Sequence, residues 1–372
     1  MSGEPRHGVV RVLSIAKVAD ADYYLKAVAS GIEDYYAIGE EPGRWTAHTH
    51  ELLGIDGELE PAQLTAVLAG RHPLTAVPLI ESANRKIPAF DLTFRAPKSV
   101  SLAFALGSPE MTVEITAAHD AAVDAALGYL ERHAAVSRRG HNGTEQVTAD
   151  GFIAAVFRHR TSRAADPHLH THALVPNMVR SSDDGRWRTI DARHLYAHSL
   201  TAGYVYESHL RDELARRLGV GWGPIVNGIA DLDGITQPVL RAFSTRREDI
   251  EHRMAALGTT TARGAEIAAL DTRAAKDHTL NYDDLVDDWA QRAADLGMSP
   301  TAIDALADRN FRRSAAPGSP AEVRRIETHL LGADGLTERA STFDRRDVIR
   351  ALASAYPHGA SAQLLEAHAD SI

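Results

Sequence analysis

The 372-residue chain contains no cysteine, which excludes disulfide scaffolds, thiolate metal sites, iron–sulfur clusters and a cysteine nucleophile. It has no apolar run of the roughly 18–20 residues that a membrane-spanning helix needs. Its first residues carry charges where a signal peptide would carry an apolar segment. We therefore expect a cytoplasmic protein without membrane insertion.

Lysine is also scarce, with five residues against 35 arginines. None of the five follows a glycine as in the phosphate-loop pattern GxxxxGK[ST], so we expect no ATP-driven chemistry in this chain. Arginine suits bidentate recognition of phosphate, although a GC-rich genome produces the same bias. The formal net charge of −10 argues against a small basic nucleic-acid binder. It does not exclude nucleic acid, because the local field of a groove decides binding.

The 44% apolar and 24% charged residues are an ordinary globular balance, and their spacing predicts a mixture of strands and helices. Strands are predicted at 9–16, 89–95, 152–157, 169–178 and 187–190, and helices at 23–30, 64–69, 110–136, 200–218 and 344–355. Pro97 predicts a turn into residues 98–101. The region 239–310 is mostly helical in pattern, and 311–322 has the composition of a linker. The expected fold class is α+β with a helical extension.

Four histidines lie within the fourteen residues 159–172. His168, His170 and His172 alternate, so they share one face of a strand, and His159 ends the preceding strand. Three imidazoles from two adjacent strands form a site for one divalent first-row cation. The alternative is a solvent-facing polar strand. Similar histidine patterns also occur in oxygenases and hydrolases, so the pattern predicts a metal more strongly than it predicts a reaction.

Two tyrosine pairs precede the histidines, at 23–24 and 35–36. A phenol near pKa 10 is a weak nucleophile at neutral pH and becomes competent beside a base or a metal-bound phosphate. Asp91 stands among apolar strand residues, where a buried carboxylate needs a partner. It is expected to accept a proton from Tyr23 or to orient a ligating histidine; an exposed strand-face position is the alternative.

These residues belong to four blocks: YYLKAVASGIEDYY (23–36), FDLTFRAPKSVSLAF (90–104), FRHRTSRAADPHLHTHALVPNM (157–178) and GRWRTID (185–191). Together they resemble the relaxase domain of MobF-type conjugative relaxases, the TrwC and F-plasmid TraI type, within the HUH endonuclease superfamily. The resemblance covers about residues 9–300. It implies an antiparallel sheet flanked by helices, with helical fingers at about 230–310 that close over single-stranded DNA.

The resemblance also implies roles for individual residues. By position, Tyr23 is the nucleophile, Tyr35 a second active tyrosine and Asp91 the aspartate beside the nucleophile. The metal ligands are His159, His170 and His172, and His168 is not required. The metal is expected to be Mg or Mn, with Zn, Ni or Co as alternatives. Five basic residues near these strands are expected to contact DNA phosphates: Arg95, Lys98, Arg158, Arg160 and Arg163.

The implied activity is nicking and strand transfer at a plasmid or integrative-element origin of transfer, through a 5′-phosphotyrosyl intermediate. The expected partners are single-stranded DNA, the hairpin DNA of that origin and a type IV secretion and coupling apparatus, with the protein as a monomer. The expected domains are a relaxase domain at 1–310, a linker at 311–342 and the truncated start of a helicase module at 343–372. Two other readings stay open: a metal-dependent small-molecule oxygenase or hydrolase, and a non-catalytic DNA-binding module.

Overall fold

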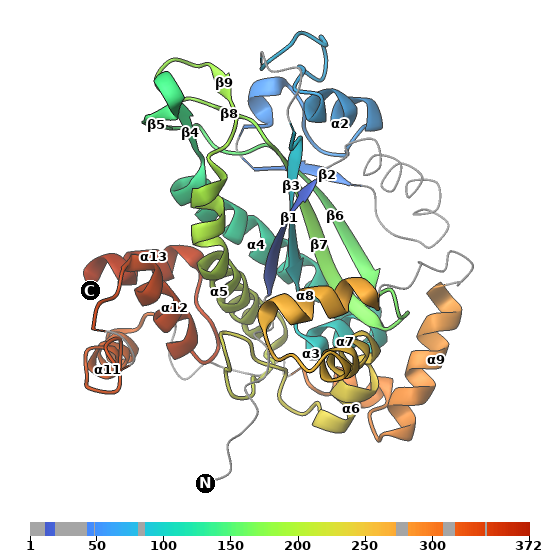
Figure 1. Ribbon diagram of the computed structural model, residues 1–372. Coiled ribbons are helices and arrows are strands. Elements are labelled where there is room, and N and C mark those ends of the chain that lie inside the picture. The colour runs from blue at the N-terminus through green and yellow to red at the C-terminus, as the bar shows by residue number, and fades with distance from the viewer. Residues whose placement is uncertain are drawn as a thin grey trace.

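A computed structural model describes residues 12–18, 43–47, 49–80, 86–272, 282–307, 317–338 and 341–372. Its centre is a five-stranded sheet in which every paired strand is antiparallel to its neighbour, in the order β1-β3-β7-β6-β2. The strands are β1 (Leu13–Val18), β2 (Arg44–Thr46), β3 (Ala89–Arg95), β6 (Ala154–Thr161) and β7 (Pro167–Pro176). The strands β3, β7 and β6 therefore occupy the middle of the sheet (Figure 1).

One face of the sheet packs against α3 (Lys98–Leu106), α4 (Pro109–Ala134) and α5 (Ala192–Leu218). Side chains alternate across a strand, so Phe90, Leu92 and Phe94 of β3 enter this core and are almost completely buried. On the opposite face, α2 (Pro61–Leu68) and Trp45 cover a second, smaller cluster that includes Phe157. The residues Asp91, Thr93 and Arg95 share that opposite face by the same alternation.

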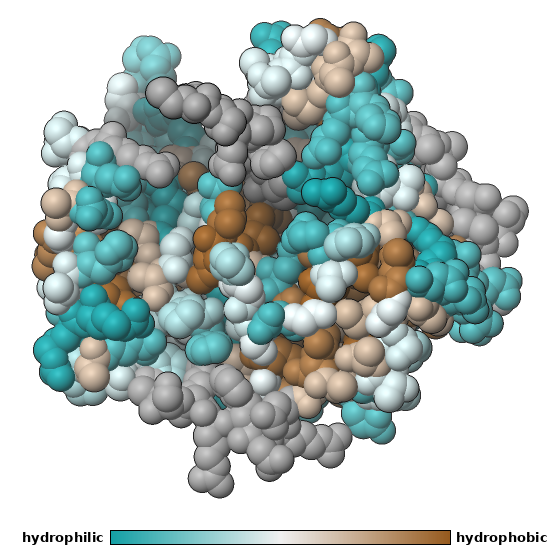
Figure 2. Space-filling view, turned by 90° about the horizontal axis from the view of Figure 1, so that it is seen from below, coloured by the Kyte–Doolittle hydropathy of each residue, from teal (hydrophilic) through white to brown (hydrophobic). Residues whose placement is uncertain are grey.

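Two short hairpins extend one end of the molecule: β4 (Val136–Arg139) with β5 (Glu145–Thr148), and β8 (Val179–Arg180) with β9 (Trp187–Arg188). At the other end lies a helical extension, α6 to α10 (Figure 1). Its helices are α6 (Gln237–Ala242), α7 (Thr245–Ala256), α8 (Ala262–Asp271), α9 (Tyr282–Asp295) and α10 (Pro300–Asp304). Seen from that end, hydrophobic residues form separate patches among hydrophilic ones (Figure 2).

The last three helices form a C-terminal layer, α11 (Pro320–Leu330), α12 (Arg345–Ala355) and α13 (Ala362–Ser371). The fully buried Arg211 of α5 donates to the carbonyl of Ala353 at 2.6 Å and to that of Gly228 at 2.8 Å. Ile349, Leu352 and Tyr356 are buried in the same core as the sheet. This layer is therefore packed onto the helices that support the sheet.

The α+β class with an antiparallel sheet flanked by helices is confirmed, and two local expectations differ from the structure. The turn predicted after Pro97 is the start of α3, because the Ser101 amide donates to the carbonyl of Pro97 in the i→i−4 pattern of a helix. The Ser101 hydroxyl donates to the same carbonyl, and Ser99 Oγ accepts from the Leu232 amide. The segment 311–342, expected as a linker, contains α11. The helix predicted at 23–30 lies outside the described residues. Among the helices that the structure does describe, none combines the length and apolarity required to cross a bilayer.

Candidate metal centre

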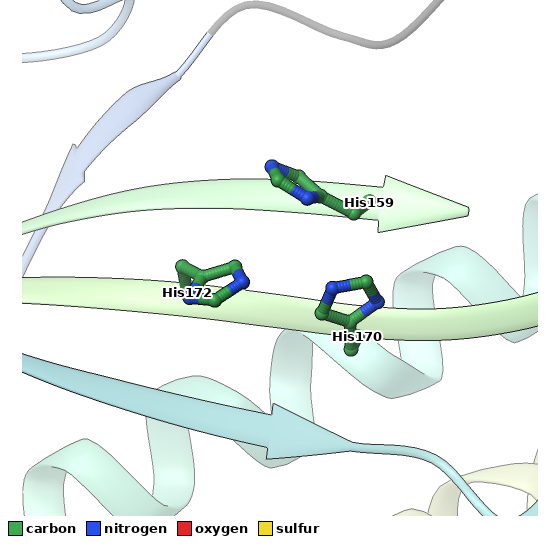
Figure 3. Close-up of side chains that lie close together, drawn as sticks. All are labelled: His159, His170 and His172. Carbon is green, nitrogen blue, oxygen red and sulfur yellow. The ribbon is translucent and has the colours of Figure 1, made fainter. Parts of the chain in front are cut away.

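Three histidines converge on the sheet face opposite α4 and α5. His159 of β6 pairs directly with His170 of β7, and His172 follows two residues later on the same strand face. One ring nitrogen from each lies within 4.8 Å of the others. The ring centroids are 5.0–5.2 Å apart, and the ring planes are inclined by 54–73° to one another (Figure 3). Two central strands thus hold the group rigidly.

The second nitrogen of two of these rings already has a partner. His172 Nδ1 lies 2.9 Å from both carboxylate oxygens of Asp91, and His170 Nδ1 lies 2.8 Å from the carbonyl of His168. Such contacts to a carboxylate or carbonyl fix the tautomer of a metal-bound histidine and leave Nε2 for the cation. The residues present therefore fit a divalent metal ion.

The protonation state of His170 also fits a metal ligand. Burial, followed by the neighbouring His168, His159 and His172, holds the pKa of His170 well below its usual range. A neutral imidazole is the form that ligates metals. At neutral pH His170 therefore presents a lone pair and not a positive charge.

Asp91 is buried, with 8% of its surface exposed, and its carboxylate also accepts from Thr93 Oγ1 at 3.3 Å. Thr93 Oγ1 lies 3.3 Å from His172 Nδ1 as well. The contact with His172 fits the role of orienting a histidine, whereas the role toward Tyr23 involves a residue outside the described ones and stays a prediction. Thr93 is not among the residues predicted for the site, although its position two residues after Asp91 on the same strand places it on the same face.

His168 shares the strand face of the other two but not the cluster of ring nitrogens. Its ring stacks on His170, with centroids 4.6 Å apart and planes 28° apart. Burial and the charge of Lys98 hold its pKa well below the usual range. His168 therefore supports the ring of His170 by contact and by its carbonyl.

The five basic residues predicted around the site divide into two groups. Arg95 pairs in register with His170 and shares its face, and burial lowers its pKa while Asp91 opposes that shift. Lys98 Nζ donates to the carbonyl of Pro167 at 2.6 Å, and burial lowers its pKa to about 8. Both lie beside the start of β7.

The expectation that Arg158 surrounds the histidines is wrong. Arg158 pairs in register with Thr171 and points to the helix-covered face, where its guanidinium donates to Asp120 of α4 at 2.6 Å. Arg160 stacks over the ring of Tyr282 of α9, 3.8 Å from its centroid. Arg163 is exposed in the loop that follows β6. Sequence adjacency to His159 suggests one site for all three, but strand alternation places Arg158 and Arg160 on the other face of β6, and Arg163 follows the end of that strand.

Both tyrosine pairs, Tyr23 with Tyr24 and Tyr35 with Tyr36, lie outside the described residues. Their roles stay predictions. Among the described residues, the three histidines are the one group of potential ligands close enough to hold a metal ion.

Comparison with known proteins agrees with the metal centre inferred from the geometry. The family model described as TrwC relaxase matches residues 18–296. The Multifunctional conjugation protein TraI of Escherichia coli (strain K12) is 30% identical over 361 residues, which is 91% of this chain and 19% of that protein. The chain thus spans about a fifth of the length of this curated relative.

Solved structures are similar over most of the chain. A metal-bound structure of the conjugative relaxase TrwC in complex with oriT DNA has a TM-score of 0.68 and 31% identity, covering 77% of this chain and 99% of the other. A structure of TrwC complexed with a 27-mer DNA that comprises the recognition hairpin and the cleavage site has a TM-score of 0.66 with the same identity and coverage.

Proposed function

The chain belongs to the TrwC relaxase family, and from this we propose that it nicks one DNA strand at an origin of transfer and transfers that strand during conjugation. The observation that carries the proposal is the triad His159, His170 and His172 with Asp91 behind it. A metal held by three imidazoles keeps coordination positions open for a phosphate.

The reaction assigned here is a transesterification. The Tyr23 hydroxyl attacks the scissile phosphorus, its proton passes to solvent or a nearby base, and the bond from phosphorus to the 3′ oxygen breaks. The products are a 5′-phosphotyrosyl bond and a free 3′-OH, so the reverse reaction rejoins the strand without ATP. When bound, the metal polarises the phosphate and stabilises the charge that develops on it.

The residues of this chain then have separate tasks. Asp91 keeps His172 in one tautomer and one orientation, and the carbonyl of His168 does the same for His170. Arg95, beside His170, supplies a positive charge on the phosphate side of the site. An all-imidazole ligand set favours a first-row transition ion over Mg²⁺, which prefers oxygen ligands.

The wider assignments extend the same proposal. The substrates are single-stranded DNA and the hairpin of the origin of transfer, with a type IV secretion and coupling apparatus as the partner of a cytoplasmic monomer. Tyr35 takes part in a second transfer. The helical extension is the element proposed to close over single-stranded DNA, and the segment from 343 is related to the start of a helicase module.

The test is covalent capture. Protein mixed with Mn²⁺ and an oligonucleotide that carries the nick site and a label at its 3′ end is denatured and run on a gel. We expect a DNA-linked band for the wild type, no such band for Tyr23→Phe, and retention of oligonucleotide binding by that variant. Tyr24→Phe is the matched control and is expected to keep the band.

The outcomes separate the alternatives. DNA binding without any adduct in the wild type would indicate a non-catalytic DNA-binding module. Absence of both binding and adduct would favour small-molecule chemistry at the metal. An unchanged band in Tyr23→Phe would move the nucleophile to another tyrosine.

A further inference from the structure

The loop that joins the two histidine-bearing strands is tightly closed on itself. Residues 162–166 connect β6, which carries His159, to β7, which carries the other two ligands. Ser162 Oγ accepts from the amides of Ala164 and Asp166 at 3.2 Å each, and the Ser162 amide donates to the carbonyl of Asp166 at 2.9 Å. The relative placement of the two strand ends therefore depends on this loop.

Asp166 turns its carboxylate away from the loop and into the helical extension. Its residue surface is 1% exposed. Oδ2 accepts from the Thr245 amide at the first turn of α7 at 2.9 Å, and Oδ1 lies 3.5 Å from Arg292 Nη2 on α9. A buried carboxylate needs such partners, and an amide at a helix N-terminus favours negative charge.

A second contact joins the same loop to the same extension. The indole Nε1 of the fully buried Trp289 on α9 donates to the carbonyl of Ala165 at 2.9 Å. From the other side, Lys98 Nζ holds the carbonyl of Pro167, where β7 begins. The structure places α7, α8 and α9 around this end of β6 and β7 (Figure 1).

These contacts link the docking of the helical extension to the conformation of the loop at residues 162–166. If the extension undocks, the Asp166 carboxylate and the Ala165 carbonyl lose partners that the loop cannot replace, and the loop loses its external restraints. A group that stabilises the docked extension therefore stabilises the loop geometry, and the reverse holds by thermodynamic linkage. Neither the metal ligands nor Asp91 provide this connection.

We propose that Asp166 is a positioning residue that couples docking of the helical extension to the geometry of the three-histidine metal centre. The proposal rests on the proposed function, because it assumes that these histidines hold a metal. It assigns to the extension an effect on metal affinity even in the absence of DNA. DNA held by the extension would then raise the affinity of the centre for its cation.

The test uses the full chain without DNA. Mn²⁺ is titrated into wild type, Asp166→Asn and Asp166→Ala by calorimetry, and hydrogen exchange is followed in peptides that cover 157–172. We expect Mn²⁺ to bind Asp166→Ala about 10-fold more weakly, the low end of the effect of removing groups that orient metal-bound histidines. Exchange in 161–167 is expected to rise. Asp166→Asn keeps an acceptor for Thr245 and is expected to lose less.

Asp288→Ala is the matched control, because Asp288 pairs with the same Arg292 at 3.2 Å from within α9 and does not contact the loop. It is expected to bind Mn²⁺ as the wild type does. Arg292→Gln is the second variant, in case Asp166→Ala fails to fold; Arg292 is partly exposed, and its change is expected to weaken Mn²⁺ binding in the same direction. In a cleavage assay, saturating Mn²⁺ is expected to restore the rate of both.

Two results distinguish this inference from the function beneath it. If His170→Ala abolishes Mn²⁺ binding but Asp166→Ala and Arg292→Gln bind it with wild-type affinity, the coupling is refuted and the metal centre stands. If His170→Ala binds Mn²⁺ like the wild type, the metal assignment itself is wrong and the coupling falls with it. Equal weakening by Asp288→Ala would also overturn it, since the effect would then come from α9 alone.

Discussion

His172 and Asp91 are joined by a contact of 2.9 Å from Nδ1 to each carboxylate oxygen, across the boundary between β7 and β3. In register His172 faces Thr93, so the contact to Asp91 is diagonal. Asp91 is therefore the partner of a candidate metal ligand, and this contact provides the partner that a buried carboxylate needs.

Asp91→Asn is expected to bind Mn²⁺ about 10- to 100-fold more weakly, since the charged partner of a metal-bound histidine is removed. Cleavage is expected to slow at limiting metal and to recover at saturating metal. Raising the pH is not expected to help. A rate–pH profile at two metal concentrations checks this, with Asp120→Asn on the opposite face as control. Recovery at high pH without added metal would instead make Asp91 the base for Tyr23.

His168→Ala and His170→Ala are expected to differ, although the two residues occupy equivalent strand positions. His170→Ala removes a ligand and should abolish stoichiometric Mn²⁺ binding. His168→Ala removes only the stacked ring, because the carbonyl that His170 uses belongs to the backbone. We expect weakening of less than about 10-fold, below the usual effect of losing an orienting hydrogen bond. Equal metal loss in both, measured by bound metal per protein, would contradict the ligand set.

The sequence predicts those parts of the site that follow from the alternation of side chains along a strand. The alternation of His168, His170 and His172 gives one face directly, and His159 joins them because β6 and β7 are adjacent. The same periodicity, applied to Arg158, would have placed it on the other face. Strand periodicity does not identify the partner of Asp91, because His172 lies 81 residues away in sequence.

The sequence predicts the fold least well where contacts of individual side chains determine the local structure. Residues 98–101 follow a proline and contain two serines, a composition typical of turns. The hydroxyls of Ser99 and Ser101 are instead bonded within and beside α3. The sequence predicts a linker and a new module where the structure has the C-terminal layer, because nothing in that stretch shows that Arg211 donates to the carbonyl of Ala353.

Leu352→Ala tests whether that layer unfolds with the rest. Leu352 of α12 is completely buried in the main core, so its truncation should cost about 2–5 kcal/mol of unfolding free energy. We expect a single, shifted urea transition, followed by tryptophan fluorescence and by circular dichroism. Leu331→Ala is the control, since Leu331 is 66% exposed. Two separate transitions would mean that the layer is an independent module.

The raised pKa of Glu207 predicts an unusual pH dependence of the free energy of unfolding. Burial raises its pKa to about 8, and Arg211 only partly opposes the shift. Between about pH 4.5 and 8 the folded chain therefore holds a proton that the unfolded chain releases, so this group destabilises the fold as the pH rises. Glu207→Gln should remove that dependence, so its free energy of unfolding should fall less than that of the wild type between pH 5 and pH 8.

The control for this prediction is Glu213, which lies further along the same helix. Burial raises the pKa of Glu213, but hydrogen bonds from Arg216 and Arg217 outweigh it and leave the pKa lowered. Glu213→Gln should therefore cost stability at neutral pH and cost less as the pH falls. Urea unfolding of both variants at pH 5, 6.5 and 8 measures the two slopes. Parallel slopes for the two variants would refute the assignment to Glu207.

The pairing of His159 with His170 has a consequence for the order of assembly of the chain. All three ligands come from one β-hairpin whose strands close over a short loop, so their contacts carry a low loop-closure cost. The contact between Asp91 and His172 closes a far longer stretch of chain, so its loop-closure cost is higher. A partly folded chain with only this hairpin formed already holds a weak cation site, and Mn²⁺ should therefore raise the refolding rate in stopped-flow experiments. No such acceleration would mean that the hairpin forms only after β3 has docked.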